Sequence, residues 1–248
     1  MKQFYLRFGA FLLLLAFCTL TFSVPSLLQL NSITPSDAAP SPPPAFTVVL
    51  DAGHGGEDGG AVSESGVYEK DLNLALTFLL RDLLVANGVE VVLTRSTDTL
   101  LYDKTVDYHG RKKALDLAAR QKIAEETENC VFVSIHMNAF PQSQYSGLQV
   151  WYSPNTEASF TLAQSTQTLV RELLQPQNER KIKSATSSIY LLHRLSVPSV
   201  LIECGFLSNP QEAQLLANED YQRQLAFVLF LGLTEGLEKI SLEMQTSS

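Results

Sequence analysis

The 248-residue sequence is poor in basic residues and in cysteine, and each scarcity excludes a class of protein. There are 18 Lys and Arg against 26 Asp and Glu, which gives a formal net charge of −8. An acidic chain lacks the basic surface that nucleic acid binding needs, so we expect no nucleic-acid partner. Three cysteines are too few for a disulfide-stapled scaffold. Cys130 and Cys204 lie beside apolar strand-like runs, which favours buried free thiols over a disulfide.

Acidic residues are absent from the N-terminal stretch, residues 1–30, where Lys2 and Arg7 precede the apolar run GAFLLLLAFCTLTFSV. This pattern predicts a secretory signal or an uncleaved signal anchor, and the lack of a clean A-x-A site favours the anchor. A lipoprotein signal at Cys18 is disfavoured, because Phe17 stands where that signal needs a small residue.

A linker rich in Pro, Ser and Ala follows over residues 31–45 and is expected to be extended. Residues 46–240 then have the size of one domain, with no internal repeat or second linker.

Apolar strand-like runs alternate with amphipathic helical stretches along this domain. We expect strands near 48–50, 89–95, 130–136, 147–153 and 198–205, and helices over 69–88, 111–128, 156–174 and 219–239. A further helix begins at NPQE, with Asn209 as its N-cap and Glu212 at the capping-box position. Alternation of this kind predicts an α/β fold, a mostly parallel twisted sheet with helices on both faces.

The glycine-rich stretch VVLDAGHGGEDGGAV follows the first strand and matches neither the GxGxxG nor the GxxxxGK[ST] phosphate-binding motif. Its histidine therefore needs another explanation. His54 follows one strand, His136 ends another, and Glu203 lies near the end of a third. The carboxyl ends of parallel strands share one edge of a sheet, where active sites form.

Two histidines and a carboxylate are a common ligand set for catalytic zinc, with a fourth position left to water. Glu69, one short loop beyond His54, is the candidate carboxylate beside His54 and His136. Glu203 follows the apolar run VLI, so burial should raise its pKa into the range useful for a proton shuttle. Zinc-activated water would then make amide hydrolysis feasible at neutral pH.

Each of these residues has a simpler interpretation. His54 and His136 could be core histidines, Glu69 a helix N-terminal acid favoured by the helix dipole, and Glu203 the partner of a cation. Cys204 could be a nucleophile, although no further histidine has an evident route to it. We interpret His109 and His193 as structural or solvated. The basic cluster of Arg180, Lys181 and Lys183 is expected to be a solvated loop.

Taken together, these stretches resemble the zinc-dependent N-acetylmuramoyl-L-alanine amidases of type 3. The matching segments span about 47–237 and are VVLDAGHGGEDGGAV, YEKDLNLAL, LTR, VSIHMNA and VPSVLIECGFLSNPQEAQLL. The resemblance implies that His54, Glu69 and His136 bind Zn²⁺ and that Glu203 is the catalytic glutamate. Asn138, in the family's IHxNA stretch, would lie near the substrate.

The resemblance further implies cleavage of peptidoglycan at the amide between N-acetylmuramic acid and L-alanine of the stem peptide. The short interval between His136 and Glu203 leaves little room for the regulatory helix of division-associated members. The chain is most similar to germination-specific, spore-cortex amidases, which help to make muramic-δ-lactam. Such a protein would be exported to the cell wall or cortex, with the membrane as a further partner if the anchor is uncleaved.

Two rival functions stay open at this point. One is a zinc amidase of the vegetative wall, and the other is a wall-binding or adaptor protein with an inactive site. The sequence leaves an activating protein partner unidentified.

Overall fold

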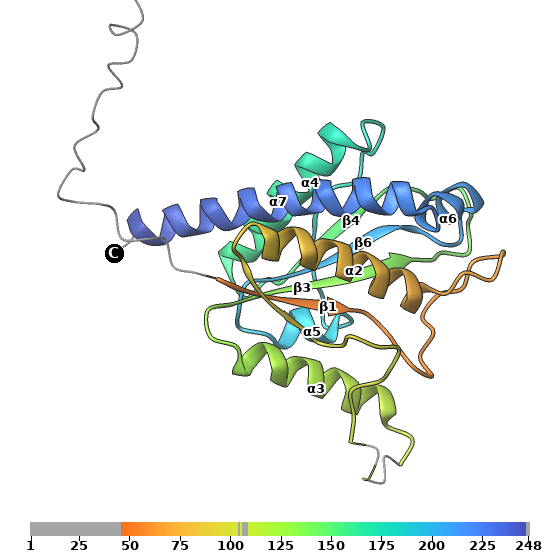
Figure 1. Ribbon diagram of the computed structural model, residues 1–248, viewed down its shortest axis with the longest axis horizontal. Helices are drawn as coiled ribbons and strands as arrows, with labels where there is room; N and C mark the ends of the chain where they lie inside the picture. The colour runs from red at the N-terminus through yellow and green to blue at the C-terminus, as the bar shows by residue number, and fades with distance from the viewer. Residues whose placement is uncertain (1–45, 104, 106–108, 247–248) are drawn as a thin grey trace, which may run out of the picture. The chain divides into compact units, whose positions relative to one another are not determined.

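The computed structural model describes residues 46–246 apart from 104 and 106–108, and these described residues form one compact unit. Its strands form one six-stranded sheet of order β2-β1-β3-β6-β4-β5 (Figure 1). The strands are β1 (Thr47–Ala52), β2 (Glu90–Leu93), β3 (Cys130–Asn138), β4 (Gln149–Tyr152), β5 (Lys183–Ser184) and β6 (Ser199–Phe206). The expected anchor over 1–30 and linker over 31–45 lie outside the described residues. Within the described part of the chain, no helix combines the length and apolarity that crossing a membrane requires.

Every strand pair in this sheet is parallel except β4 with β6. The mostly parallel sheet confirms the expected fold class. Because β1, β3 and β6 are neighbours and run in the same direction, their carboxyl ends meet at one edge.

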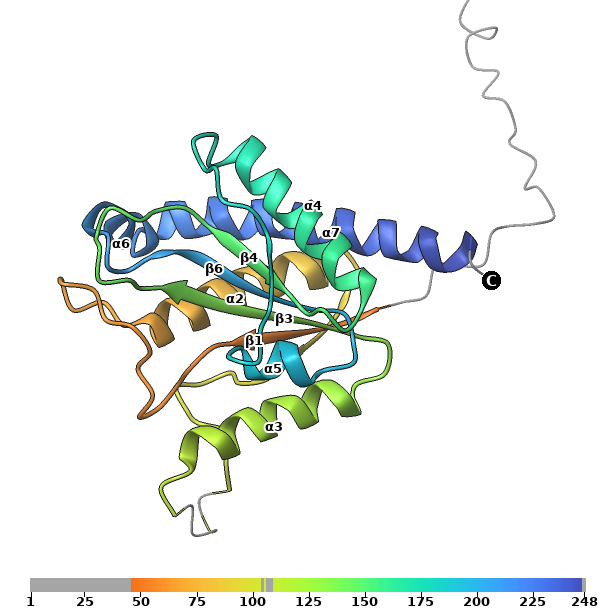
Figure 2. The same ribbon diagram turned by 180° about the vertical axis from the view of Figure 1, so that it is seen from behind.

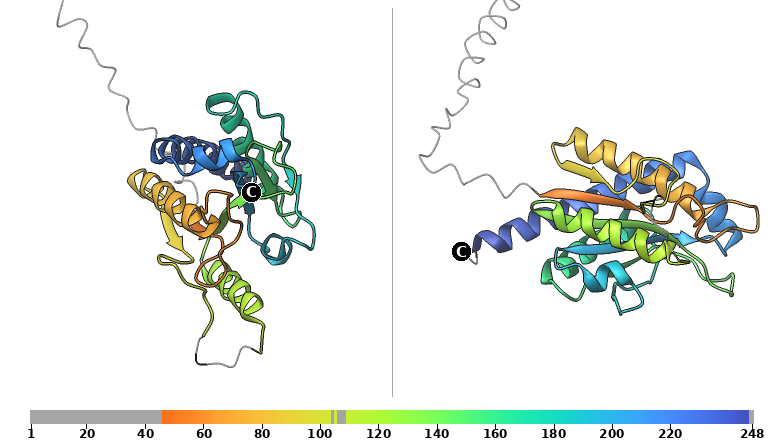
Figure 3. Two further views of the ribbon diagram at one scale, coloured as in Figure 1. Left: turned by 90° about the vertical axis from the view of Figure 1, so that its right-hand side faces the viewer. Right: turned by 90° about the horizontal axis from the view of Figure 1, so that it is seen from below.

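Helices cover both faces of the sheet, as the end views in Figure 3 show. One face packs against α2, α4 and α7, and the other against α3 and α5; Figure 2 shows α4 beside α7 from behind. The helices are α2 (Glu69–Ala86), α3 (Lys112–Glu126), α4 (Glu157–Leu173), α5 (Tyr190–Arg194), α6 (Pro210–Leu216) and α7 (Glu219–Thr246). The sheet therefore has a large apolar core on the first face and a smaller one on the second.

The leucine spacing of α2 explains how this helix is placed. Leu72, Leu76, Leu80 and Leu84 recur every fourth residue and are all buried against the sheet. The helix ends at Ala86, two residues before Gly88, which adopts a left-handed φ of 80°. This face of α2 fixes Glu69, its first residue, at the edge where the strands end.

The start of α6 matches the sequence prediction only in part. The side chain of Asn209 caps the helix by accepting from the backbone N–H groups of Gln211 and Glu212. The other half of the expected capping box, in which the Glu212 side chain would accept from the backbone N–H of Asn209, was wrong. The Glu212 carboxylate turns away and accepts from the N–H groups of Gly147 and of Phe206, the last residue of β6, because those two donors lie close to it.

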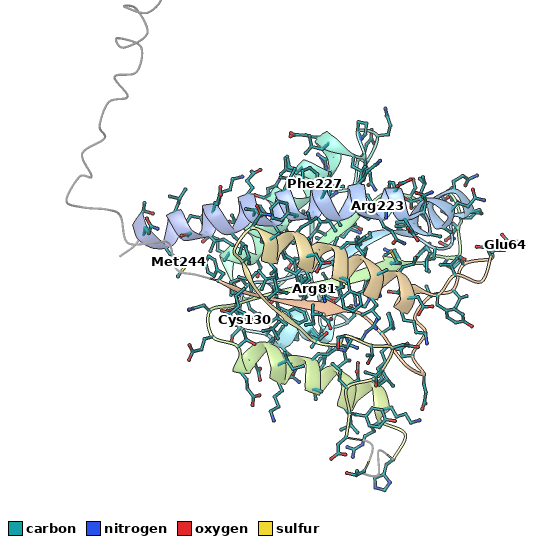
Figure 4. The ribbon with its side chains drawn as sticks, viewed as in Figure 1. Glu64, Arg81, Cys130, Arg223, Phe227 and Met244 are labelled. Carbon is teal, nitrogen blue, oxygen red and sulfur yellow. The ribbon has the colours of Figure 1, made fainter. Side chains whose placement is uncertain are left out.

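Other differences concern short elements and strand ends. β5 and α5 were not expected, and α7 continues to Thr246 rather than ending near 239. β3 extends two residues past His136, because β6 continues to pair with it as far as Asn138. Cys130 and Cys204 are buried free thiols, as expected. Figure 4 shows Cys130 at the opposite end of the fold from Glu64, which lies on the loop before α2.

Candidate metal centre

The loop after β1 brings His54 against β3. The N–H of Gly53 donates to the carbonyl of Ile135, which continues the pairing of β1 with β3. A Cβ atom on Gly53 would lie 2.3 Å from the His136 ring, so only glycine leaves room for that imidazole. His54 itself has a φ of 63°, in the left-handed region that non-glycine residues rarely adopt. Strained backbone of this kind is concentrated at functional sites.

Glu69 is the centre of the cluster, and its carboxylate is buried. Its Oε1 lies 2.9 Å from Nδ1 of His136 and 3.2 Å from Nε2 of His54. The backbone N–H of Met137 also donates to Oε1 at 3.1 Å, and that of Ala61 donates to Oε2 at 2.8 Å. These donors hold the carboxylate between the two histidine rings.

The structure brings His54, Glu69 and His136 together as a group that could hold a metal ion. One ligand atom from each lies within 4.8 Å of the others, and the ring centroids of the two histidines are 5.0 Å apart. Tetrahedral ligands at about 2.1 Å from zinc lie roughly 3.4 Å from one another, so small side-chain movements would close this set around an ion.

Charge favours the ionised form of the central carboxylate. Burial alone would raise the pKa of Glu69, but hydrogen bonds and charge from His136 and His54 hold that pKa well below its usual range. Burial works to lower the pKa of His54, yet the neighbouring carboxylates of Glu69 and Asp58 raise it above its ordinary value. The cluster is therefore centred on the ionised carboxylate of Glu69, which lies between the two histidine rings and favours a bound cation.

Glu203 lies directly opposite His136 in the register of β3 and β6. Its Oε2 is buried and has no hydrogen-bond partner among the described residues. Burial raises the pKa of this carboxyl to about 7, and the charge of His136 only partly opposes the rise. A carboxyl that exchanges its proton near neutral pH thus faces the metal-binding group.

Asp58 and Asn73 belong to the site, although no sequence motif singled them out. Oδ1 of Asp58 lies 2.9 Å from Nδ1 of His54, the ring nitrogen on the far side from Glu69. Asn73, one turn along α2, donates to the Gly53 carbonyl and to Glu69. A second partner on a ligating histidine fixes its ring and tautomer.

A buried pair of arginines supports the loop from beneath. Arg120 donates to the carbonyls of Ala52 and His54, and it pairs with the buried carboxylate of Asp51. Arg95 also donates to the Ala52 carbonyl. Sequence reasoning missed this network, although α3 carried a signal. Its buried residues, Asp116, Arg120 and Ala124, recur every fourth position.

The remaining sequence candidates lie around or outside the cluster. Asn138 is the last residue of β3 and is half-buried, two positions after His136. Cys204 is buried on the opposite face of β6, where burial raises the pKa of its thiol well above the ordinary value. That orientation and pKa do not suit a nucleophile. His193 is exposed on α5, and His109 lies in the loop before α3.

The prediction that Arg180, Lys181 and Lys183 form a solvated loop was wrong for one of these residues. Arg180 is half-buried, and its guanidinium carbon lies 4.4 Å from the centre of the Phe206 ring. Lys181 is exposed, and Lys183 is an exposed residue of β5. The aromatic ring that covers Arg180 comes from the end of β6, a contact that local sequence does not reveal.

Comparisons with known proteins agree with this geometry. Residues 48–235 match the model of the N-acetylmuramoyl-L-alanine amidase family. The chain is 39% identical over 186 residues to the germination-specific N-acetylmuramoyl-L-alanine amidase of Bacillus subtilis, covering 75% of this chain and 77% of that protein.

Solved structures show the same fold. The CwlD amidase of Clostridioides difficile, solved in complex with the GerS lipoprotein, is 40% identical with a TM-score of 0.74, covering 78% of this chain and 98% of that one. The catalytic domain of the amidase CwlV from Paenibacillus polymyxa is 34% identical with a TM-score of 0.65, covering the same two shares. The chain belongs to the N-acetylmuramoyl-L-alanine amidase family.

Proposed function

We propose that this amidase binds zinc through His54, Glu69 and His136 and hydrolyses the amide between the lactyl group of N-acetylmuramic acid and L-alanine of the stem peptide. The observation that carries the proposal is the unpartnered Oε2 of Glu203, buried opposite this group of ligands. A buried carboxyl without a partner is costly unless the site uses it.

The donor set fits zinc. Two imidazoles and one ionised carboxylate are the ligands of catalytic zinc sites that keep a fourth position open. When bound, zinc lowers the pKa of a coordinated water to about 7 and polarises a carbonyl oxygen. The chain supplies the orientation, because Asp58 contacts His54 and backbone N–H groups hold Glu69.

Glu203 is the proposed proton shuttle. Its carboxylate accepts the proton of the attacking water and delivers it to the amine nitrogen that leaves with the peptide. A pKa of about 7 keeps both protonation states populated at neutral pH, which suits a group that must first accept and then donate. Asn138, at the end of the same strand as His136, is the proposed neighbour of the substrate.

The cell wall is the site of action that family membership implies. We further propose that residues 1–30 direct export and anchor the chain, with the linker over 31–45 separating this segment from the catalytic domain. The CwlD structure was solved with a lipoprotein, and this supports a search for an activating protein partner here as well.

A role in the spore cortex, with formation of muramic-δ-lactam, is the finer proposal. Similarity to the germination-specific amidase of Bacillus subtilis supports it. Deleting the gene should abolish lactam in the cortex while leaving vegetative wall unchanged. The opposite result would identify a vegetative amidase.

The amidase reaction itself is tested by mass spectrometry of purified peptidoglycan treated with the zinc-loaded protein. We expect free stem peptides that begin with L-alanine and glycan strands that keep the lactyl carboxylate. Glu203→Gln is the matched control and should release neither product. Peptide-free glycan without the lactyl group, or no release at all by the wild type, would contradict the proposal.

A further inference from the structure

We propose that Arg180 binds a carboxylate of the substrate peptide, carried by the second or third residue beyond the amide that is cleaved. The inference rests on the proposed function, because it requires a peptide to extend across the sheet edge from Glu203. It assigns Arg180 a role in substrate specificity that is separate from the chemistry.

The sheet register places Arg180 at a suitable distance from Glu203. Gln149 on β4 is the direct neighbour of Glu203 on β6, so both side chains project from the same face. Nη1 of Arg180 donates to Oε1 of that glutamine at 3.3 Å. With strands about 4.8 Å apart, the guanidinium lies roughly two strand spacings, ~10 Å, from the glutamate. An extended peptide covers this distance in about three residues.

The guanidinium is held in a fixed orientation. Its Nε donates to the carbonyl of Ser146 at 2.7 Å. One face of the group packs on the Phe206 ring at 4.4 Å, and the Tyr145 ring lies 6.0 Å away. A cation stacked on an aromatic ring is partly shielded from water, which strengthens its attraction for an anion. Arg180 is therefore preorganised, and binding would order little additional side chain.

The charge of Arg180 is only partly matched within the part of the chain that the structure describes, where it opposes the burial that raises the pKa of the Glu212 carboxyl. None of the ion pairs among those residues includes it, and only two of its five N–H groups donate to protein acceptors there. Glu212 is the nearby acid and is half-buried, but its two oxygens already accept from the N–H groups of Gly147 and Phe206. An arginine with free donors in a planar fork is suited to a carboxylate.

A cleft lies beside Arg180. It has a volume of about 680 Å³ and is lined by Arg180, Tyr145, Gln175, Glu212 and Tyr221 among others. This volume lies within the roughly 300–1,000 Å³ typical of ligand sites. The lining also includes the exposed Glu179. Arg180 is the only cation of this lining, among aromatic rings, side-chain amides and the carboxylates of Glu179 and Glu212, so a peptide carboxylate in this cleft would pair with Arg180.

The test compares two synthetic substrates with the zinc-loaded whole chain. Both are N-acetylmuramoyl-L-alanyl-D-glutamyl-L-lysine, one with free carboxylates and the other with those carboxylates amidated. The wild type should prefer the free form by about ten- to a hundredfold in kcat/KM, as expected for a charged hydrogen-bonded pair. The preference should reside mainly in KM, because the contact forms with substrate and persists in the transition state.

Arg180→Gln should bring the two substrates to nearly equal kcat/KM, with zinc content unchanged. Arg180→Lys keeps the charge and should keep part of the preference, which guards against a glutamine variant that fails to fold. Lys183→Gln is the control, since it removes an exposed cation from the same segment and should leave the preference intact. Equal losses on both substrates in the Arg180 variants would show a purely structural role. If the wild type releases no peptide from either substrate, the proposed function fails instead.

Discussion

Nη2 of the buried Arg120 donates a hydrogen bond of 2.7 Å to the carbonyl oxygen of His54. The same guanidinium pairs with Asp51 and Asp116, both buried, so a charged network lies directly beneath the proposed metal ligand. Charge from those carboxylates outweighs burial and raises the pKa of Arg120 further above its ordinary value. Because His54 adopts a left-handed backbone, this bond restrains a conformation that the residue does not favour by itself.

Arg120→Met should therefore lower both stability and metal affinity. Removing one partner of a buried ion pair leaves an uncompensated charge and typically costs about 3–5 kcal/mol. Loss of the restraint on His54 should weaken zinc binding by about ten- to a hundredfold. Urea unfolding and zinc titration measure the two effects.

Lys122→Met on the same helix is the matched control, because Lys122 is exposed and its ion pair within the described chain is with the exposed Glu126. It should change the free energy of unfolding by no more than about 0.5 kcal/mol. Wild-type zinc affinity in Arg120→Met would refute the restraint on His54.

Gly53→Ala should displace a metal ligand without removing any side chain. The added Cβ would lie 2.3 Å from the His136 ring, so the imidazole must move. We expect zinc affinity to fall at least tenfold while the fold is retained. Gly66→Ala is a suitable comparison, because no atom lies within 4 Å of its added Cβ. Alanine at position 66 is destabilised only by its positive φ, so this variant should bind zinc with wild-type affinity. Equal zinc affinities in the two variants would contradict the steric argument.

The sequence was sufficient to predict those residues of the site that lie at the ends of strands. Parallel strands end at one edge, so His54, His136 and Glu203 had to converge once the fold class was known. The structure adds what the pattern could not give, namely that Glu203 and His136 are direct neighbours in the register. The placement of Glu69 followed from the leucine stripe of its helix.

The supporting residues were not predictable in the same way. From the sequence, Arg120 would be taken for a solvent-exposed helix residue. Only its separation of four residues from Asp116 and from Ala124 indicates that it is buried. Arg180 lies in a segment with other cations, and its aromatic contact comes from a distant strand. In both cases the partner is brought close by tertiary packing, which local composition does not encode.

The stability of the metal-free protein should depend on pH through Glu203. Burial raises the pKa of this carboxyl from 4.5 to about 7, so the folded state binds its proton more tightly than the unfolded chain. This contribution to stability is complete below pH about 4.5 and is lost as the pH rises through 7. Glu203→Gln does not titrate there. Its free energy of unfolding, relative to wild type, should rise by about 3 kcal/mol between pH 4.5 and 8. Urea unfolding with a chelator measures this difference, and a constant value across the range would contradict the assignment.

Substitutions of Glu69 and Glu203 should have different effects on zinc binding and on catalysis. Glu203→Gln keeps the shape of the side chain but removes the carboxylate that accepts a proton. It should fold and retain about one zinc per chain, while losing the 10²–10⁴-fold that general acid–base catalysis typically contributes. Glu69→Gln removes a charged ligand, so metal affinity and activity should fall together. Zinc stoichiometry and peptide release from muropeptides are measured for both variants, with His136→Ala as a reference for ligand loss. Loss of zinc from Glu203→Gln, together with full zinc and activity in Glu69→Gln, would mean that the two roles are reversed.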